Sequence, residues 1–215
     1  MAVKRSQSRG IRPVRQALYS GLVMLAGALL IAKSVADMRA SSQSASPYLM
    51  LGIFPALLAP IAFVYYLLKI PVVRSMRRGT SAIARWTVSA DEFRRFAEAD
   101  ARVESETRSP NFLKLPDTIP AEGVEVIFSD DGVLIGDGYF PLSTTKGRRV
   151  NRVRTIGSQP TMIEFGTILE TRASTSSATT KAVRTAETLR VPVASDAARQ
   201  ADNVIRRFEI ALARR

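Results

Sequence analysis

Three acidic residues lie close together around one expected hairpin, and they are the side chains of this chain best suited to chemistry: Asp130, Asp131 and Asp137. Clustered carboxylates can hold Mg²⁺ or Ca²⁺, because both ions prefer oxygen ligands. However, Asp130-Asp131-Gly132 is also a favourable turn sequence, and the distal Glu of a Ca²⁺-binding loop is missing. We therefore interpret these acids as turn residues, and the sequence predicts no metal site and no cofactor.

The chain contains no histidine and no cysteine. Their absence removes the commonest general base, the commonest metal ligand, thiol nucleophiles and disulfides. The Ser and Thr residues of the polar stretch 173–180 have no evident base to activate them. The basic segment 146–149 could meet phosphate, but as a solvated hairpin tip it needs no function, and we favour that interpretation. The sequence therefore predicts no catalytic residues, and we expect a protein that is not an enzyme.

The formal net charge of +12 raises the question of nucleic-acid binding. Residues 1–88 carry twelve basic side chains and one acid, whereas residues 89–215 carry nineteen basic side chains and eighteen acids. A nucleic-acid groove should be basic within the folded domain, and this part of the chain is nearly neutral. The positive excess instead flanks two hydrophobic segments, where anionic lipids are the natural partner. We expect no nucleic-acid partner.

Two hydrophobic segments near the N-terminus are long enough to cross a bilayer. Seventeen uncharged residues separate Arg15 from Lys33, and Tyr48–Leu68 is a mostly apolar run of 21 residues. A helix rises about 1.5 Å per residue and a bilayer core is about 30 Å thick, so each segment is close to the required length. The sequence predicts a transmembrane hairpin over 16–72, with helices at about 16–35 and 48–72.

The basic residues around the hairpin predict its orientation. The tail 1–15 and the connector 73–88 are basic, whereas the loop between the helices holds only Arg39 against Asp37. Basic flanks stay in the cytoplasm, so both termini should be cytoplasmic, and the Arg- and Ala-rich composition favours a bacterial inner membrane. Lipid headgroups should be contacted by five arginines: Arg12, Arg15, Arg74, Arg77 and Arg78. Ser34-Val35-Ala36 resembles a signal cleavage site, but the long apolar run and Lys33 before the site favour retention.

Small residues are spaced so that the two helices could pack on each other. They fall at intervals of four and seven on the first helix and of four and three on the second: Ala17, Gly21, Ala28, Ala32, Gly52, Ala56 and Ala59. Small side chains let membrane helices approach closely. Pro55 and Pro60 each remove a backbone hydrogen bond, and this predicts a kink in the second helix.

Residues 89–215 have the pattern of an α+β domain in the cytoplasm. Ser89 and Glu92 form a capping box, which predicts a helix over Ala90–Glu104. Alternating residues then predict about five or six antiparallel strands, at Val124–Phe128, Val133–Tyr139, Val150–Ile156, Thr161–Arg172 and Lys181–Val193. A closing amphipathic helix should begin near Ser195, as its N-cap, and run to Ala213. Trp86, in the basic connector, either contacts headgroups or packs on this domain.

The order of these elements resembles bacterial membrane proteins in which a pleckstrin-homology-like domain follows two N-terminal helices, and the YcxB-like group is the nearest such family. The resemblance is one of layout and covers most of the chain. It implies a curved antiparallel sheet closed at one end by Ser195–Ala213. Domains of this kind often serve as interaction modules, and no binding residue is carried over.

We therefore expect a non-enzymatic membrane protein whose cytoplasmic domain is a scaffold for a protein partner, with basic flanks on anionic lipid. The alternative is a small transporter or channel accessory subunit, in which the hairpin oligomerises and Pro55 and Pro60 form a gate. The helices show little polar lining for such a path. A membrane-bound enzyme is the least favoured reading, and a homo-oligomer is compatible with either of the first two.

Overall fold

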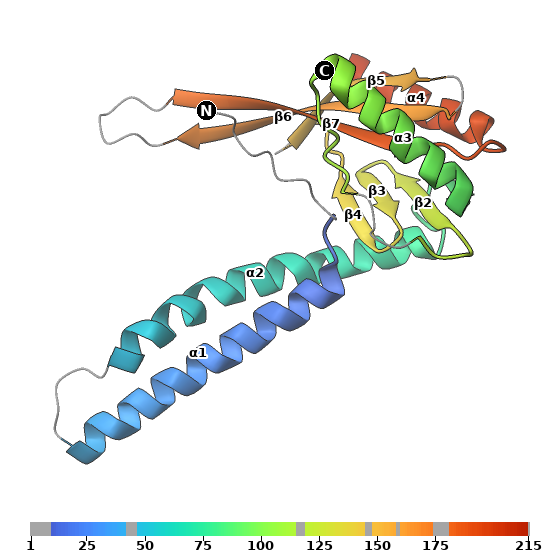
Figure 1. The fold of residues 1–215 in the computed structure, drawn as a ribbon. Coiled ribbons are helices and arrows are strands. Elements are labelled where there is room, and N and C mark those ends of the chain that lie inside the picture. The colour runs from blue at the N-terminus through green and yellow to red at the C-terminus, as the bar shows by residue number, and fades with distance from the viewer. Residues whose placement is uncertain are drawn as a thin grey trace. The chain divides into compact units, whose positions relative to one another are not determined.

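The computed structural model describes residues 10–41, 47–114, 119–144, 148–157, 160–173 and 181–214. The chain divides into a helical unit, Ile11–Arg74, and a globular unit that comprises Ser75–Arg215 together with Met1–Gly10 (Figure 1). Parts of the basic segment 146–149 and of the polar stretch 173–180 lie outside the described residues, so the predictions made for them stay predictions.

The helical unit consists of two long helices, α1 over Pro13–Ser41 and most of α2, which spans Pro47–Arg77. Each helix begins with proline, whose fixed φ and missing N–H suit the first helical position. Both helices are longer than the predicted ones. The helix α2 runs on through three internal prolines, Pro55, Pro60 and Pro71.

The globular unit contains two antiparallel sheets and two helices, which confirms the predicted α+β class. The first sheet has the order β1 (Ala84–Val88), β2 (Val124–Ser129), β3 (Gly132–Ile135) and β4 (Gly138–Pro141). The second has the order β5 (Arg148–Ile156), β6 (Met162–Ala173) and β7 (Lys181–Pro192). The helix α3 (Ala90–Thr107) lies against β7, and α4 (Ala198–Ala213) lies against β5 and β1 (Figure 1).

The structure corrects the expected course of residues 73–88. This segment was expected to be a basic connector, but α2 continues to Arg77 and Ala84–Val88 forms an edge strand of the first sheet. Trp86 on that strand is only 5% exposed, and its Nε1 donates to the Pro192 carbonyl at 3.0 Å. The side chain therefore packs in the core of the domain rather than against lipid.

A second correction concerns strand number, since the described residues form seven strands where five or six were expected. Besides the unexpected β1, the single strand expected over Val133–Tyr139 is a hairpin. It turns at Gly136–Asp137, where Gly136 has a φ of +56°. Glycine adopts this left-handed conformation without the steric cost that a Cβ imposes. The chain can therefore reverse within two residues and pair Ile135 with Gly138.

The helix termini were predicted with mixed success. The α3 capping box is present: the Glu92 N–H donates to the Ser89 hydroxyl and the Ser89 N–H donates to the Glu92 carboxylate. The closing helix α4 is present and ends at Ala213 as predicted, but its predicted N-cap was wrong, because the helix has Ala197 at its N-cap and no side-chain cap. The Ser195 N–H is used elsewhere, in a 2.9 Å hydrogen bond to Glu92 Oε1. That bond joins the start of α3 to the segment that leads into α4.

Stacked aromatic rings connect the two sheets and α4 through the core. Phe165 of β6 lies 5.1 Å from Phe208 of α4 and 5.9 Å from Phe128 of β2, measured between ring centroids. Phe128 in turn lies 5.3 Å from Trp86. Aromatic pairs at these separations add about 0.5–1.5 kcal/mol each beyond the burial of their area. Successive side chains of a strand point to opposite faces of the sheet. On β6, Phe165 points into the core, and its neighbour Glu164 lies on the opposite face, toward α3.

Candidate functional sites in the helical hairpin and the ionic network

The two long helices expose an unusual amount of apolar surface. Pro13–Ala40 and Leu49–Arg77 have mean hydropathies of 1.8 and 2.1, and in each only 11% of the most apolar window is buried. By length and composition, both could cross a membrane. Among the described residues, every large hydrophobic side chain that is exposed, except Ile210, lies on these helices. They are therefore not core helices of the domain, which would bury this surface.

Glycines bring the two helices into close contact. A Cβ added to Gly27 would lie 3.0 Å from the Ala56 nitrogen and 3.1 Å from the Gly52 carbonyl oxygen. A Cβ added to Gly52 would lie 2.9 Å from the Gly27 carbonyl oxygen. The backbones meet here with no room for a side chain on either glycine. On α1 the buried and half-buried positions of this face follow steps of four and three: Pro13, Ala17, Ser20, Met24, Gly27, Ile31 and Ser34.

The small residues expected to pack are only partly on this face. Ala17 and Ala59 are 5% and 7% exposed, and Gly21 faces the Phe63 ring. Ala28 and Ala32 are exposed, and the structure places them one position beyond the buried Gly27 and the half-buried Ile31. The difference comes from the spacing of the contacts. The contacting residues of α1 repeat about every 3.5 residues, whereas the expected face was based on the 3.6 residues per turn of a straight helix, so the two sets of positions separate along the helix.

The five arginines expected to contact lipid differ in their surroundings. Arg74 and Arg78 are exposed, and Arg15 is exposed beside Tyr19. Arg12 is half-buried, and its Nε is buried without a hydrogen-bond partner. Arg77 forms a 2.6 Å ion pair with Asp137, with half of its side chain still exposed. Contact of these side chains with headgroups stays a prediction.

The end of α2 is held inside the globular unit by an arginine that the sequence did not single out. Arg85 of β1 donates from Nη2 to the carbonyl oxygens of Met76 and Arg77, the last residues of α2. Its Nε also lies 3.4 Å from the Glu125 carboxylate. Met76 is fully buried. Arg85 thus satisfies carbonyl groups that have no intrahelical partner at a helix C-terminus.

The acids around the first hairpin do not converge. Asp130 accepts two hydrogen bonds from Arg207 of α4, at 2.8 and 3.1 Å, and Asp137 pairs with Arg77. The hydrogen bond from the Arg207 guanidinium lowers the pKa of Asp130 below its usual value, against the opposing effect of partial burial. Ser129 pairs with Gly132 across a tight turn, as expected. Within the described residues, no group of three His, Cys, Asp or Glu side chains could hold a metal ion.

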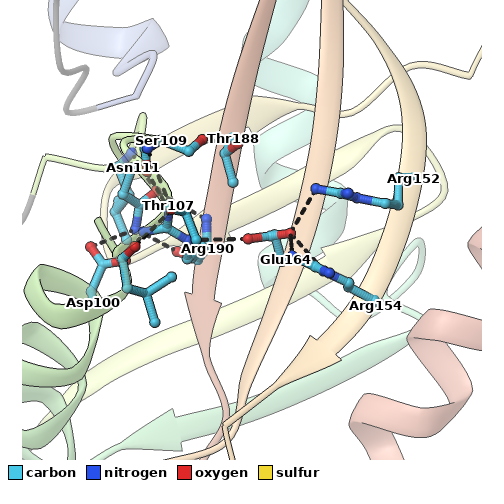
Figure 2. A network of polar contacts seen from close by, with 11 residues as sticks. Asp100, Thr107, Ser109, Asn111, Arg152, Arg154, Glu164, Thr188 and Arg190 are labelled. Carbon is cyan, nitrogen blue, oxygen red and sulfur yellow. Dashed lines mark hydrogen bonds and ion pairs between the residues drawn. The ribbon is translucent and has the colours of Figure 1, made fainter. Parts of the chain in front are cut away.

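A buried ionic network is the most polar feature of the domain interior (Figure 2). Arg190 of β7 is completely buried and pairs in register with Glu164 of β6. Its Nε lies 3.3 Å from Glu164 Oε2, and its Nη1 lies 2.5 Å from Asp100 Oδ1 on α3. The guanidinium therefore joins two strands of the sheet to the helix that covers it.

Asn111 completes the network on the side of α3. Its amide nitrogen donates to Asp100 Oδ2 at 3.0 Å and to the Arg190 carbonyl at 3.1 Å. Its side-chain oxygen accepts from the backbone N–H groups of Arg190 and Leu113. Arg190 also donates from Nη2 to the Ser109 carbonyl. The segment after α3 is thereby fastened to β7 by side chains as well as by backbone.

Two further arginines approach Glu164 from β5 (Figure 2). Arg152 and Arg154 are about half exposed, and they donate to Glu164 Oε1 at 3.0 and 2.8 Å. Each oxygen of Glu164 and Asp100 therefore has an arginine or amide donor. Carboxylates held by several fixed donors in this way are rigidly positioned, so the arrangement suits a structural clamp.

Sequence reasoning missed this clamp, although one signal was present. Glu164 lies between Ile163 and Phe165, and Arg190 lies between Leu189 and Val191, so each charge interrupts a run of buried strand residues. A strand that is buried on both faces reads as continuous apolar sequence. A charge within it requires a buried partner. The partner on α3, Asp100, is too distant in sequence to be identified from spacing.

Among the described residues, two shallow grooves lie on the globular unit. One, of about 360 Å³, is lined in part by Glu92, Arg95 and Ser195. Partial burial would raise the pKa of Glu92, but hydrogen bonds from Ser195 and Ser89 outweigh it and lower the pKa to about 2. The other, of about 400 Å³, is lined in part by Arg207 and Ile210 of α4.

Comparison of the chain with protein-family models, with curated proteins and with solved structures finds no match in any of the three.

Proposed function

We propose that this chain is an integral membrane protein of the bacterial inner membrane, with both termini in the cytoplasm and a globular unit that acts as a non-enzymatic interaction module. The apolar surface of α1 and α2 carries the proposal. Fully burying one Leu or Phe side chain is worth about 1.5–3 kcal/mol. The row of side chains such as Leu29, Phe54 and Ile61, each more than 60% exposed, therefore needs a nonaqueous environment.

The charge distribution supports the proposed orientation. Arg15, Lys69 and Arg74 lie toward the ends of α1 and α2 that adjoin the globular unit along the chain, whereas the opposite ends carry Lys33, Asp37 and Arg39. Lys33 and Asp37 lie 3.9 Å apart and partly neutralise each other. The greater positive charge stays on the cytoplasmic side. Anionic lipids are then the natural partners of the basic flanks, with about 1 kcal/mol for each basic side chain near the surface.

The order of strands supports a pleckstrin-homology-like fold for the globular unit. A four-stranded antiparallel meander is followed by a three-stranded one and then by the helix α4. The additional helix α3 between β1 and β2 departs from the simplest form of that layout. We propose this fold class on topology alone, and it implies a binding module rather than a particular ligand.

One exposed apolar side chain suggests where a protein partner binds. Ile210 of α4 is 46% exposed and lies along the groove of about 400 Å³, next to the Asp130–Arg207 pair. An apolar residue surrounded by charged ones is typical of the centre and rim of a protein interface. We place the partner surface on this face of α4.

The interaction role is tested with full-length protein in native membranes. Wild-type chain and Ile210→Asp are cross-linked, solubilised and purified in parallel, and the proteins bound to each are quantified. We expect one partner whose yield falls at least about tenfold in the variant, the loss expected from a central contact worth about 1.4 kcal/mol or more. Glu209→Gln, a change at the neighbouring position, is the matched control. Equal recovery with wild type and Ile210→Asp would contradict the proposed surface.

A further inference from the structure

The two membrane helices present matching pairs of a basic and an aromatic residue. On α1 the Arg15 guanidinium lies 5.4 Å from the centre of the Tyr19 ring and donates to the Tyr19 hydroxyl at 3.1 Å. On α2 the Lys69 ammonium lies 5.7 Å from the centre of the Tyr65 ring. Each pair spans one helical turn, and in each the basic residue is the one farther from the middle of the helix.

The backbone contact between the helices places these pairs near one level. Gly27 of α1 meets the backbone of α2 at Gly52 and Ala56, so its height corresponds to about residue 54 of α2. Because the helices are antiparallel, equal steps back along α1 and forward along α2 keep the same height. Tyr19 is then level with about residue 62 and Arg15 with about residue 66, each within about one helical turn of Tyr65 and Lys69.

We propose that Arg15, Tyr19, Tyr65 and Lys69 form a collar that binds lipid phosphates and fixes the depth of the hairpin in the bilayer. This inference rests on the proposed membrane location. Tyrosine rings favour the boundary between hydrocarbon and headgroups, where the ring is in apolar surroundings and the hydroxyl is wet. Basic side chains next to them extend toward the phosphates. Both features occur on both helices, within about one helical turn of the same height.

The opposite end of the hairpin agrees with this boundary. Seventeen uncharged residues separate Arg15 from Lys33. The distance along the helix axis between these two charges is about 27 Å, close to a bilayer core of about 30 Å. No charged residue occurs between Arg39, in the last turn of α1, and Lys69 of α2. The collar and Lys33 therefore bracket one apolar layer.

The collar predicts that side chains along each helix change sharply from contact with water to contact with lipid. The chain has no native cysteine, so single cysteines can be introduced without background. Val14 and Leu68 lie at or outside the collar, whereas Leu22 and Ile61 lie inside it. All four side chains are more than half exposed on the hairpin surface, at 63%, 67%, 54% and 70%. Any protection of one pair must therefore come from lipid rather than from the protein.

The experiment measures the rate at which each single-cysteine variant of the full chain reacts with a charged maleimide in nanodiscs of anionic phospholipid. Thiolate is the reactive form, and it does not form within hydrocarbon. We expect Val14→Cys and Leu68→Cys to react at least about tenfold faster than Leu22→Cys and Ile61→Cys. If all four react alike, the membrane location itself is wrong.

The collar is then tested by adding Arg15→Leu and Lys69→Leu together. Without its phosphate contacts the hairpin should slide inward, and the reaction at Val14→Cys and Leu68→Cys should slow severalfold. Arg94→Leu with Arg102→Leu is the control, because it removes the same charge from exposed positions of α3 in the globular unit and should leave these rates unchanged. The collar is disproved, with the membrane location intact, if the first pair of substitutions has no effect or if the control has the same effect.

Discussion

Arg190 and Glu164 face each other across β7 and β6, with Arg190 Nε 3.3 Å from Glu164 Oε2 and both side chains almost completely buried. The pair would be costly to form alone, because removing two charges from water costs several kcal/mol for each ion. Here Asp100, Asn111, Arg152 and Arg154 add further hydrogen bonds, so that the network is satisfied. Its consequence is to hold α3 and the segment after it on the second sheet.

Removing the central cation should be strongly destabilising. Arg190→Ala leaves Glu164 and Asp100 buried without their shared partner, and we expect a loss of about 3–5 kcal/mol in the free energy of unfolding. Arg154→Ala removes a half-exposed partner and should cost about 1 kcal/mol or less. Denaturant unfolding of full-length protein can be followed by the fluorescence of Trp86, the single buried tryptophan. Equal effects of the two substitutions would contradict the clamp.

The Glu92 cap should make stability depend on pH in the acid range. Its folded pKa of about 2 lies below the ordinary value of 4.5 for a glutamate side chain, so the folded state favours the carboxylate form. The resulting stability is complete above about pH 4.5 and is lost as pH falls toward 2. Glu92→Gln removes the charge, so we expect it to lower stability at pH 7. The difference in the free energy of unfolding between wild type and Glu92→Gln should become smaller as the pH is lowered from 4.5 to the lowest pH at which unfolding stays reversible. A constant difference would show that ionisation of Glu92 is not involved.

Adjacent positions on α1 should respond very differently to a larger side chain. Gly27→Val places methyl groups against the Gly52 carbonyl and the Ala56 nitrogen, so we expect the helices to separate by a few ångströms. Ala28→Val, one residue further on, adds its methyl groups on the exposed side and should change nothing. Spin labels on Leu25 and Leu57, both exposed, report the separation in nanodiscs. If the distance between the two labels increased in both variants, or in neither, the observed packing face of α1 would be contradicted.

These residues also show how far sequence alone could predict the structure. The Ser89–Glu92 box was predictable because both partners lie within one helical turn. The face of α1 was misplaced by one position at Ala28, since straight-helix spacing does not include the winding of one helix on another. Glu164, Arg190 and Asp100 were not identified, because their pairing depends on register between strands and on the packing of a distant helix. Local patterns therefore predicted most of the elements, except β1 and the division of β3 from β4, and the clamp emerged only from their assembly.

Alkaline carbonate extraction of native membranes that contain the untagged full-length chain tests the membrane proposal most directly. We expect the protein to stay in the pellet with its exposed side chains, such as Leu29 and Phe54, in lipid, and to be released only by detergent. Release into the carbonate supernatant, with the chain still folded and soluble, would contradict it.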